Sequence, residues 1–349
     1  VLGPVNLGMS RPNMKRLLAP FSLLYGSILA LRNLAFDRGI LTSESFETPV
    51  ISVGNLSVGG TGKSPMIEYL IELLAREYVV GVISRGYGRS TKGMIQVSPE
   101  HSAHQVGDEP LQFKRKFPQA MVVVCADRVK AIKAIKDQCE VILLDDAFQH
   151  RYVKPAINIL LNPYNGSYHR DQVLPWGRLR EWPSGARRAD LIVTTKCPSE
   201  LSYAELNQRQ HELQLQPHQS HYASTIDYAE YCISTNDQPQ MQSFLSLPFV
   251  LVTGIANPDP MVKELLRLGA HFKHFNYPDH HNFKPQELEV LGQQEVILTT
   301  EKDYQRLGQA LDKHAIYYWP IKMKFVHQTQ EAFDLEILRR VAHHRALFS

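Results

Sequence analysis

Short runs of Val, Ile and Leu recur along the chain and alternate with segments whose apolar residues repeat at helical spacing. The runs predict strands at residues 49–54, 78–84, 120–125, 141–144, 157–161 and 191–195. The helical spacing predicts helices at residues 64–76, 111–116 and 128–136. Strands that are apolar on both faces and alternate with helices are typical of a parallel sheet covered on two sides. We therefore expect a doubly wound α/β fold with a mostly parallel sheet.

A change in composition divides the rest of the chain. Residues 198–245 are rich in Gln, His and Ser and show little periodicity, which suggests a linker or a domain join. The α/β pattern then resumes, with strands expected at 248–253, 295–299 and 315–320 and a helix at 260–268. A chain of 349 residues is long enough for one large and one smaller domain. We predict a main domain at residues 42–220 and a smaller α/β domain at 221–349.

The N-terminal region has a different character. Residues 1–13 look like a leader, and residues 14–41 are expected to contain a membrane-associated helix. The uncharged part, residues 17–31, is shorter than the roughly 20 apolar residues of a spanning helix. Lys15, Arg16 and Arg32 flank it, and aromatic residues are interleaved, as in a helix that lies in the membrane interface. The alternative is a helix of the protein core.

Charge and cysteine content narrow the class of protein. The formal net charge is +3, too small to indicate nucleic-acid binding, and we expect no such partner. The four cysteines are scattered without a Cys-x-x-Cys pair, a pattern of thiols in a reducing compartment. We expect a monomer.

The most informative motif follows the first predicted strand and opens the first predicted helix. It resembles a Walker A phosphate loop, although Ser57 stands where the consensus has glycine. Backbone amides of such a loop surround phosphates, its lysine neutralises their charge and its hydroxyl binds Mg²⁺. The residues expected to bind nucleotide are Gly59, Gly60, Thr61, Gly62, Lys63 and Ser64. The fold is therefore expected to be of the P-loop NTPase type.

A second nucleotide-site element is an apolar strand that ends in two carboxylates, Asp145 and Asp146. A carboxylate at this end of a strand lies beside the phosphate loop and can hold Mg²⁺ directly or through water. Adjacent residues of a strand point in opposite directions, so the two aspartates are expected to have different roles. One of them could instead cap a turn.

Further motifs occur in a specific order. They are Gly-Asn-Leu-Ser-Val-Gly-Gly-Thr-Gly-Lys-Ser-Pro (54–65), Ser-Arg-Gly-Tyr-Gly (84–88), Gly-Asp-Glu-Pro (107–110), Asp-Asp-Ala-Phe-Gln-His (145–150), Leu-Pro-Trp-Gly-Arg-Leu-Arg-Glu (174–181), Pro-Asp-His-His (278–281) and Thr-Thr-Glu-Lys-Asp (299–303). This series is similar to that of the tetraacyldisaccharide 4′-kinase family, over residues 14–320. Ala147 departs from the family's usual glycine, and residues 176–178 (Trp-Gly-Arg) replace a more usual Ala-Gly-Pro.

The resemblance implies an enzyme that transfers the γ-phosphate of ATP to the 4′-hydroxyl of an acylated glucosamine disaccharide 1-phosphate, a precursor of lipid A. It also implies Mg²⁺ as a cofactor and a Gram-negative source. The enzyme would sit peripherally on the cytoplasmic face of the inner membrane, in contact with an anionic membrane surface.

A sugar hydroxyl needs a group that accepts its proton as the phosphoryl group transfers. We expect Asp108 to be this base, paired with His280 as in the family, with His281 as the rival partner. Lys63 would stabilise the transferring phosphate. Ser64, Asp145 and Asp146 are expected at Mg²⁺, and the resemblance adds Glu181.

Four residues are candidates for binding the acceptor. Arg85 and Arg128 are expected to hold phosphate, although arginines of this kind often form only surface ion pairs. Gln149 and His150 follow the metal aspartates and are expected to shape the acceptor pocket. The role of residues 301–303 stays open.

Two other functions deserve comparison. A P-loop GTPase or metallochaperone would carry a base-selecting loop of the Asn-Lys-x-Asp type and a metal cluster, for which residues 195–197 (Thr-Lys-Cys) are a poor substitute. A P-loop kinase for another sugar or small molecule is harder to separate, but it would have no use for the apolar N-terminal segment.

Overall fold

The computed structural model describes residues 18–235, 237–308, 310–311 and 316–348. Its centre is a nine-stranded sheet in the order β13-β8-β7-β6-β1-β5-β2-β4-β3. The strands are β1 (Val50–Asn55), β2 (Val80–Ser84), β3 (Ile95–Gln96), β4 (Met121–Val124), β5 (Val141–Asp145), β6 (Ile157–Pro163), β7 (Leu191–Thr195), β8 (Ser220–Tyr228) and β13 (Ile321–Phe325). All neighbours pair in parallel except β13 with β8 and β3 with β4. The expected doubly wound, mostly parallel sheet is confirmed.

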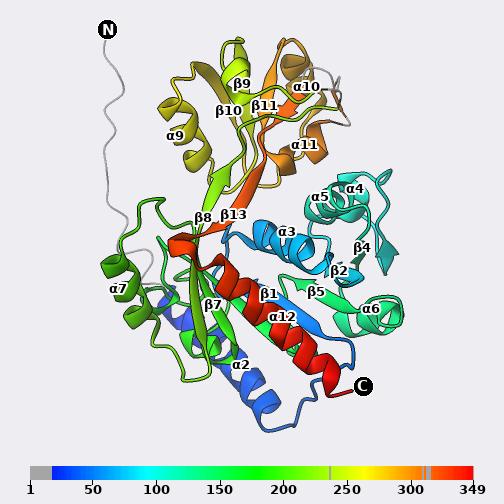
Figure 1. Cartoon of the computed structure of the whole chain (residues 1–349), viewed down its shortest axis with the longest axis vertical. Coiled ribbons are helices and arrows are strands. Elements are labelled where there is room, and N and C mark those ends of the chain that lie inside the picture. The colour runs from blue at the N-terminus through cyan, green and yellow to red at the C-terminus, as the bar shows by residue number, and fades with distance from the viewer. Residues whose placement is uncertain (1–17, 236, 309, 312–315, 349) are drawn as a thin grey trace.

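Helices cover both faces of this sheet, as buried apolar strands require. Apolar side chains of α3 (Lys63–Leu74), α5 (Asp108–Lys116) and α12 (Gln330–Ala346) share one core with the strands. In Figure 1, α12 runs across the same side of the sheet as α3. The opposite face is covered by α6 (Arg128–Ile135) and α7 (Tyr203–Leu213).

A second, smaller unit extends from one end of the large sheet (Figure 1). Its four parallel strands have the order β10-β9-β11-β12. The elements are β9 (Phe249–Thr253), β10 (Phe272–Asn276), β11 (Ile297–Thr299), β12 (Ile316–Tyr318), α8 (Met241–Phe244), α9 (Asp259–Arg267), α10 (Pro285–Gly292) and α11 (Glu301–Leu307). We call residues 229–320 the small unit and the remainder of the described chain the large unit.

The division of the chain differs from the expected boundary at residue 220. β8 crosses from the large unit into the small one, and β13 returns, so both strands belong to the nine-stranded sheet. After β13 the chain continues into α12, whose Phe333, Ile337 and Val341 are buried in the core of the large unit. The region 198–245, expected to hold a linker or a domain join, contains α7 and β8, and the chain passes from the large unit into the small unit within it.

The N-terminal helix α2 (Ala19–Asp37) lies on the outside of the large unit. It buries only Ser22, Gly26 and Phe36. Its large apolar side chains are exposed, namely Leu18 just before it and Phe21, Leu23, Leu24, Tyr25, Ile28, Leu31 and Leu34. A helix of the protein core would bury this face, so that alternative is excluded. Residues 14–17 of the predicted helix lie outside the described residues, as do Lys15 and Arg16.

Candidate active site

The phosphate loop connects β1 to α3, which begins at Lys63. Gly59 and Gly62 have φ angles of 108° and 90°, which glycine adopts without strain. The Asn55 amide donates to the Ser57 carbonyl at 2.6 Å and to the Thr61 hydroxyl at 2.8 Å, which holds the loop from inside. These bonds shape the loop before any phosphate binds. The fold places the predicted nucleotide-binding residues at the N-terminus of α3, where backbone amides can bind phosphate.

Two residues at the end of β7 brace the same loop. The Thr195 hydroxyl donates to the Thr61 carbonyl, and the Lys196 ammonium donates to the Gly60 carbonyl, both at 2.7 Å. The Thr-Lys pair is a poor match to a base-selecting loop, and its contact with the phosphate loop was not predicted. The contact of Lys196 could have been predicted, because a lysine directly after an apolar strand of this sheet lies at the same edge as the phosphate loop.

Asp145 and Asp146 have different environments, as expected. The buried Asp145 carboxylate accepts a hydrogen bond from Ser84 Oγ at 2.9 Å, and its Oδ1 has no partner among the described residues. Burial, together with the charges of Glu109 and Asp146, raises the pKa of Asp145 to about 7. Asp146 turns outward with a φ of 48° and pairs with Arg180 at 2.7 Å and Lys63 at 3.7 Å. Burial opposes ionisation, but these two cations lower the pKa of Asp146.

The residues around Asp145 fit a magnesium ion. Ser64 Oγ donates to the Glu109 carboxylate. The charges of Glu109 and Asp146 both act on Asp145, so the three carboxylates lie close to one another. The unpartnered Oδ1 of Asp145 is a buried oxygen donor of the kind that Mg²⁺ prefers. Among the described residues, no group of three or more His, Cys, Asp or Glu forms a metal cage. Mg²⁺ in kinases seldom uses such a cage, because phosphate oxygens and water complete its shell.

Glu181 lies apart from this group. Its buried carboxylate accepts from Asn33 of α2 at 2.8 Å, from Gln149 at 3.0 Å and from Arg188 at 2.7 Å. These three donors come from three separate segments, so Glu181 holds α2 against the loops that follow β5 and β6. These contacts give Glu181 a structural role, in addition to the metal-binding role that the resemblance implies.

Asp108 and His280 meet across the two units. Asp108 is the first residue of α5, and His280 follows β10 in a left-handed conformation, with a φ of 55°. His280 Nδ1 lies 2.9 Å from Asp108 Oδ2. Burial alone would raise the pKa of Asp108, but the His280 hydrogen bond and the charge of Lys302 lower it to about 2. The same hydrogen bond raises the pKa of His280. His281, the rival, instead bonds Glu287 at 2.8 Å.

Further polar contacts join the units around this pair. Lys302 of α11 donates to Glu109, so residues 301–303, whose role was open, lie at the site. Lys116 of α5 pairs with Glu68 at 2.7 Å and with Glu301 at 3.1 Å. Glu109 and Lys302 were not predicted as site residues, because their proximity arises only when the units pack together.

The expected acceptor residues occupy two settings. Arg85 is exposed, whereas Arg128 is buried and donates to the carbonyls of Cys125, Ala126 and Asp145 at 3.1–3.3 Å. Gln149 is tied to Glu181 and to the Asn55 carbonyl. Of the two arginines, only Arg85 is exposed to solvent.

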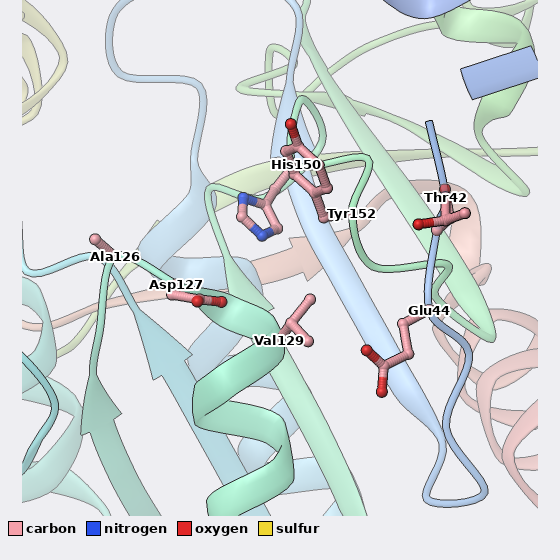
Figure 2. Close-up of a pocket in the computed structure, with 8 residues that line it drawn as sticks. Thr42, Glu44, Ala126, Asp127, Val129, His150 and Tyr152 are labelled. Carbon is pink, nitrogen blue, oxygen red and sulfur yellow. The ribbon is translucent and has the colours of Figure 1, made fainter. Parts of the chain in front are cut away.

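His150 lines a surface pocket of about 660 Å³ (Figure 2). Figure 2 shows the ring of Tyr152 beside His150 and the carboxylates of Asp127 and Glu44 on other sides of the space. Burial, and then the nearby charge of Arg128, lowers the pKa of His150 to about 4, so its ring is neutral at pH 7. An aromatic ring with hydroxyl- and carboxylate-bearing neighbours suits a polar, ring-shaped ligand.

A second cleft, of about 610 Å³, lies between the two units. The phosphate loop, Asp146 and Arg180 line one side, and His280 and Lys302 line the other. Toward β8 and β13 the cleft is lined by apolar residues, including Ile226 and Trp319. This arrangement can place a nucleoside triphosphate on the loop with its terminal phosphate facing His280 and Lys302.

Comparisons with known proteins agree with this geometry. The model of the family described as tetraacyldisaccharide-1-P 4′-kinase matches residues 14–342. The tetraacyldisaccharide 4′-kinase of Flavobacterium johnsoniae is 42% identical over 334 residues, covering 94% of this chain and 97% of the relative. That of Phocaeicola vulgatus is 39% identical over 341 residues, covering 92% and 93%.

A solved structure gives the same result for the fold. The "apo" form of LpxK from Aquifex aeolicus, in complex with ATP, superposes with a TM-score of 0.75 at 30% identity, covering 94% of this chain and 99% of that one. The similarity includes both units, because it extends over nearly the whole chain. The phosphate loop, the paired aspartates and the Asp108–His280 contact lie within the region that the family model matches. This chain belongs to the tetraacyldisaccharide-1-phosphate 4′-kinase family and is an ATP-dependent kinase of lipid A biosynthesis.

Proposed function

We propose that Asp108 and His280 together accept the proton of the sugar 4′-hydroxyl while that oxygen attacks the γ-phosphorus of ATP. The 2.9 Å contact between them, beside the phosphate loop, is the observation that carries this assignment. As the new O–P bond forms and the bond to ADP breaks, the hydroxyl proton passes to the pair. Lys63 and Arg180, which now balance Asp146, are positioned to stabilise the negative charge of the transferring group.

Ser64, Asp145 and Asp146 would hold Mg²⁺, with Glu109 close enough to contribute. The ion would draw charge from the phosphate oxygens during transfer. Asp145 must be ionised for this task, and its raised pKa means that a nearby cation is needed to keep it so at neutral pH. Arg128 supports the same end of β5 through its bond to the Asp145 carbonyl.

The acceptor is proposed to enter from the side of α2. The pocket of Figure 2 would hold part of the disaccharide between His150 and Tyr152. The exposed Arg85 is the best candidate for a phosphate of the acceptor, because the donors of Arg128 are directed to carbonyls. His150→Ala and Tyr152→Ala should raise KM for the acceptor several-fold and leave KM for ATP unchanged.

Membrane contact is proposed to occur through α2, with the helix lying in the interface on the cytoplasmic face of the inner membrane. Its length and hydropathy would also suit a spanning helix. However, Ser22, Asn33 and Arg32 all bond to loops of the large unit, and these contacts would break if the helix crossed a bilayer. The exposed apolar side would then enter the lipid, and Arg32 and Arg38 would lie near anionic headgroups.

The reaction is tested by incubating the full chain with γ-labelled ATP and a panel of acylated glucosamine disaccharides that carry or lack the 1-phosphate. Label at the 4′-position is the expected product, and Lys63→Ala should lower its rate at least about a hundredfold. Label on another hydroxyl, or equal transfer to unacylated sugars, would contradict the proposal. ATP binding measured on Asp108→Asn separates the proton-accepting role from nucleotide binding, since only turnover should fall.

A further inference from the structure

A short loop between η1 (Tyr168–Arg170) and η2 (Pro183–Arg188) is held rigidly beside α2. Within it, Leu174 N donates to Leu179 O and Leu179 N donates to Gln172 O, both at 2.9 Å. A side chain at Gly177 would lie 2.1 Å from the Gln172 carbonyl, so the turn requires glycine there. We call residues 175–178 (Pro-Trp-Gly-Arg) the loop tip. The bonds at its base present the tip in one fixed position.

The tip and the segment after it pack against the small residues of α2. Trp176 N donates to the Ser22 hydroxyl at 2.8 Å, and the Tyr25 hydroxyl donates to the Arg180 carbonyl at 3.3 Å. A side chain at Gly26 would lie 2.7 Å from the Trp182 ring, so the helix and the segment approach closely. Ser22 and Gly26, two of the three buried residues of α2, therefore face this loop and the segment after it.

The outer surface of the tip continues the exposed apolar side of α2. Trp176 is 37% exposed, and beside Ser22 the helix exposes Phe21 at 63%. Pro175 is also exposed, and the Arg178 side chain is 61% exposed and pairs with Asp171 at 3.3 Å. Tryptophan and arginine next to an apolar surface are the residue types that favour the boundary between headgroups and acyl chains.

We infer that the loop tip is a second membrane contact, with the Trp176 indole at headgroup depth and Arg178 beside lipid phosphates. The inference rests on the proposed membrane contact of α2 and adds what the helix alone lacks. Contact through α2 alone would let the whole enzyme tilt about the helix axis on the bilayer, whereas contact through α2 and a rigid loop together fixes one face toward the lipid. Because Arg180, two residues after the tip, pairs with Asp146, this orientation holds the phosphate site at a set height above the lipid. The expected occupant is an anionic bilayer surface.

The test uses the full chain with Trp182→Phe and Trp319→Phe, so that Trp176 alone reports, after thermal melting shows that the protein is folded. Vesicles contain phosphatidylcholine and phosphatidylglycerol, with or without brominated acyl chains, and no acceptor lipid. We expect a blue shift of Trp176 emission and quenching by the brominated lipid. The matched control carries Trp176→Phe as well and a tryptophan in place of the exposed Leu266 of α9, in the small unit, and should show neither effect.

The outcomes separate the two ideas. Sedimentation of the protein with vesicles but no change at Trp176 would overturn the loop contact and leave that of α2. No sedimentation would overturn both. Quenching that appears only after acceptor lipid is added would assign Trp176 to the acceptor instead and overturn the inference. Arg178→Gln should weaken vesicle binding about fivefold at low salt if the tip meets anionic headgroups, and unchanged binding would contradict that part.

Discussion

His280 Nδ1 lies 2.9 Å from Asp108 Oδ2, although 172 positions separate the two residues and they belong to different units of the molecule. The contact therefore depends on how the small unit is placed over the phosphate loop. Lys302 supports the same placement through Glu109. The Asp108–His280 contact, which we propose to be the acid–base pair, forms only when both units are in position.

The pair should control the pH dependence of turnover. The hydrogen bond with Asp108 raises the pKa of His280 above its usual value near 6.5. His280 is therefore charged when the pH is below this raised pKa. With His280 charged, Asp108 has a pKa of about 2 and is a weak base. We expect kcat to be low in acid and to rise as the pH passes the raised pKa of His280, measured with saturating ATP and acceptor.

His280→Gln keeps a hydrogen-bond donor but cannot take up the proton. This variant should lose the acid limb above pH 6 and retain a lower, flatter turnover, with ATP affinity unchanged. His281→Gln is the matched control, because its partner is Glu287, and it should keep the wild-type profile. An acid limb that persists in the His280 variant would assign it to another group.

Much of this site was predictable from local patterns. The phosphate loop and the end of β5 are short motifs at fixed positions relative to strands, and their chemistry follows from residue type. His280 was distinguished from His281 only by resemblance, because adjacent histidines give no local signal. For Lys302 the sequence left open a contact with nucleotide or with the domain interface, and it indicated no site role for Glu109. Their roles arise from packing of α5 against α11, which no spacing along the chain records.

Asp145 should make magnesium binding depend on pH. Burial, Glu109 and Asp146 raise the pKa of Asp145 to about 7 without metal, and a ligating carboxylate must be ionised. Magnesium affinity in the presence of ATP should therefore increase between pH 6 and pH 8. Asp145→Asn should remove most of this dependence and lower turnover by about a hundredfold or more. Titration calorimetry at several pH values measures the magnesium affinity. An affinity that does not change with pH in the wild type would contradict the prediction.

Lys302 and Glu109 are expected to stabilise each other. Lys302→Met would leave Glu109 and Asp108 buried beside one another without that cation, which should cost about 1–3 kcal/mol of unfolding free energy. Adding Glu109→Gln should restore part of the loss, since the uncompensated carboxylate is gone. Urea unfolding of the two single variants and the double variant measures the coupling. Strictly additive losses would show that the contact contributes nothing.

Lys196 should affect ATP binding more than chemistry. Its ammonium holds the Gly60 carbonyl, and the residue lines the cleft between the units. Lys196→Ala should loosen the phosphate loop and raise KM for ATP about tenfold, with a smaller change in kcat. Lys154, exposed on the large unit, offers the matched control. If kcat falls and KM for ATP does not, Lys196 acts on the transferring phosphate instead.

The sequence predicted the strands of the large sheet better than its edge. β1 and β5 are buried along their whole length, β6 is buried except at Pro163, and most of the residues in these three strands are apolar. β8 (Ser-His-Tyr-Ala-Ser-Thr-Ile-Asp-Tyr) lies near the edge, is only partly buried and carries polar residues, so it gives no such run. Its antiparallel partner β13 joins it from 321 onward, and that pairing brings the chain back to the large unit. The composition of the chain suggested a boundary at residue 220. Long-range pairing of β8 with β13 instead keeps both strands in the large sheet.

The last prediction concerns the exposed side of α2. Leu24 and Ile28 are 63% and 58% exposed and contribute no core packing, so changing both to Asp should leave the thermal stability unchanged. The same change should weaken sedimentation with anionic vesicles, because two charges would have to enter the apolar part of the interface. Turnover should fall on vesicle-embedded acceptor and much less on acceptor dispersed in detergent. Gly26→Leu is the contrasting variant, because it would displace Trp182 and should lower stability in detergent as well. Vesicle binding that survives the double Asp change would show that α2 does not enter the membrane.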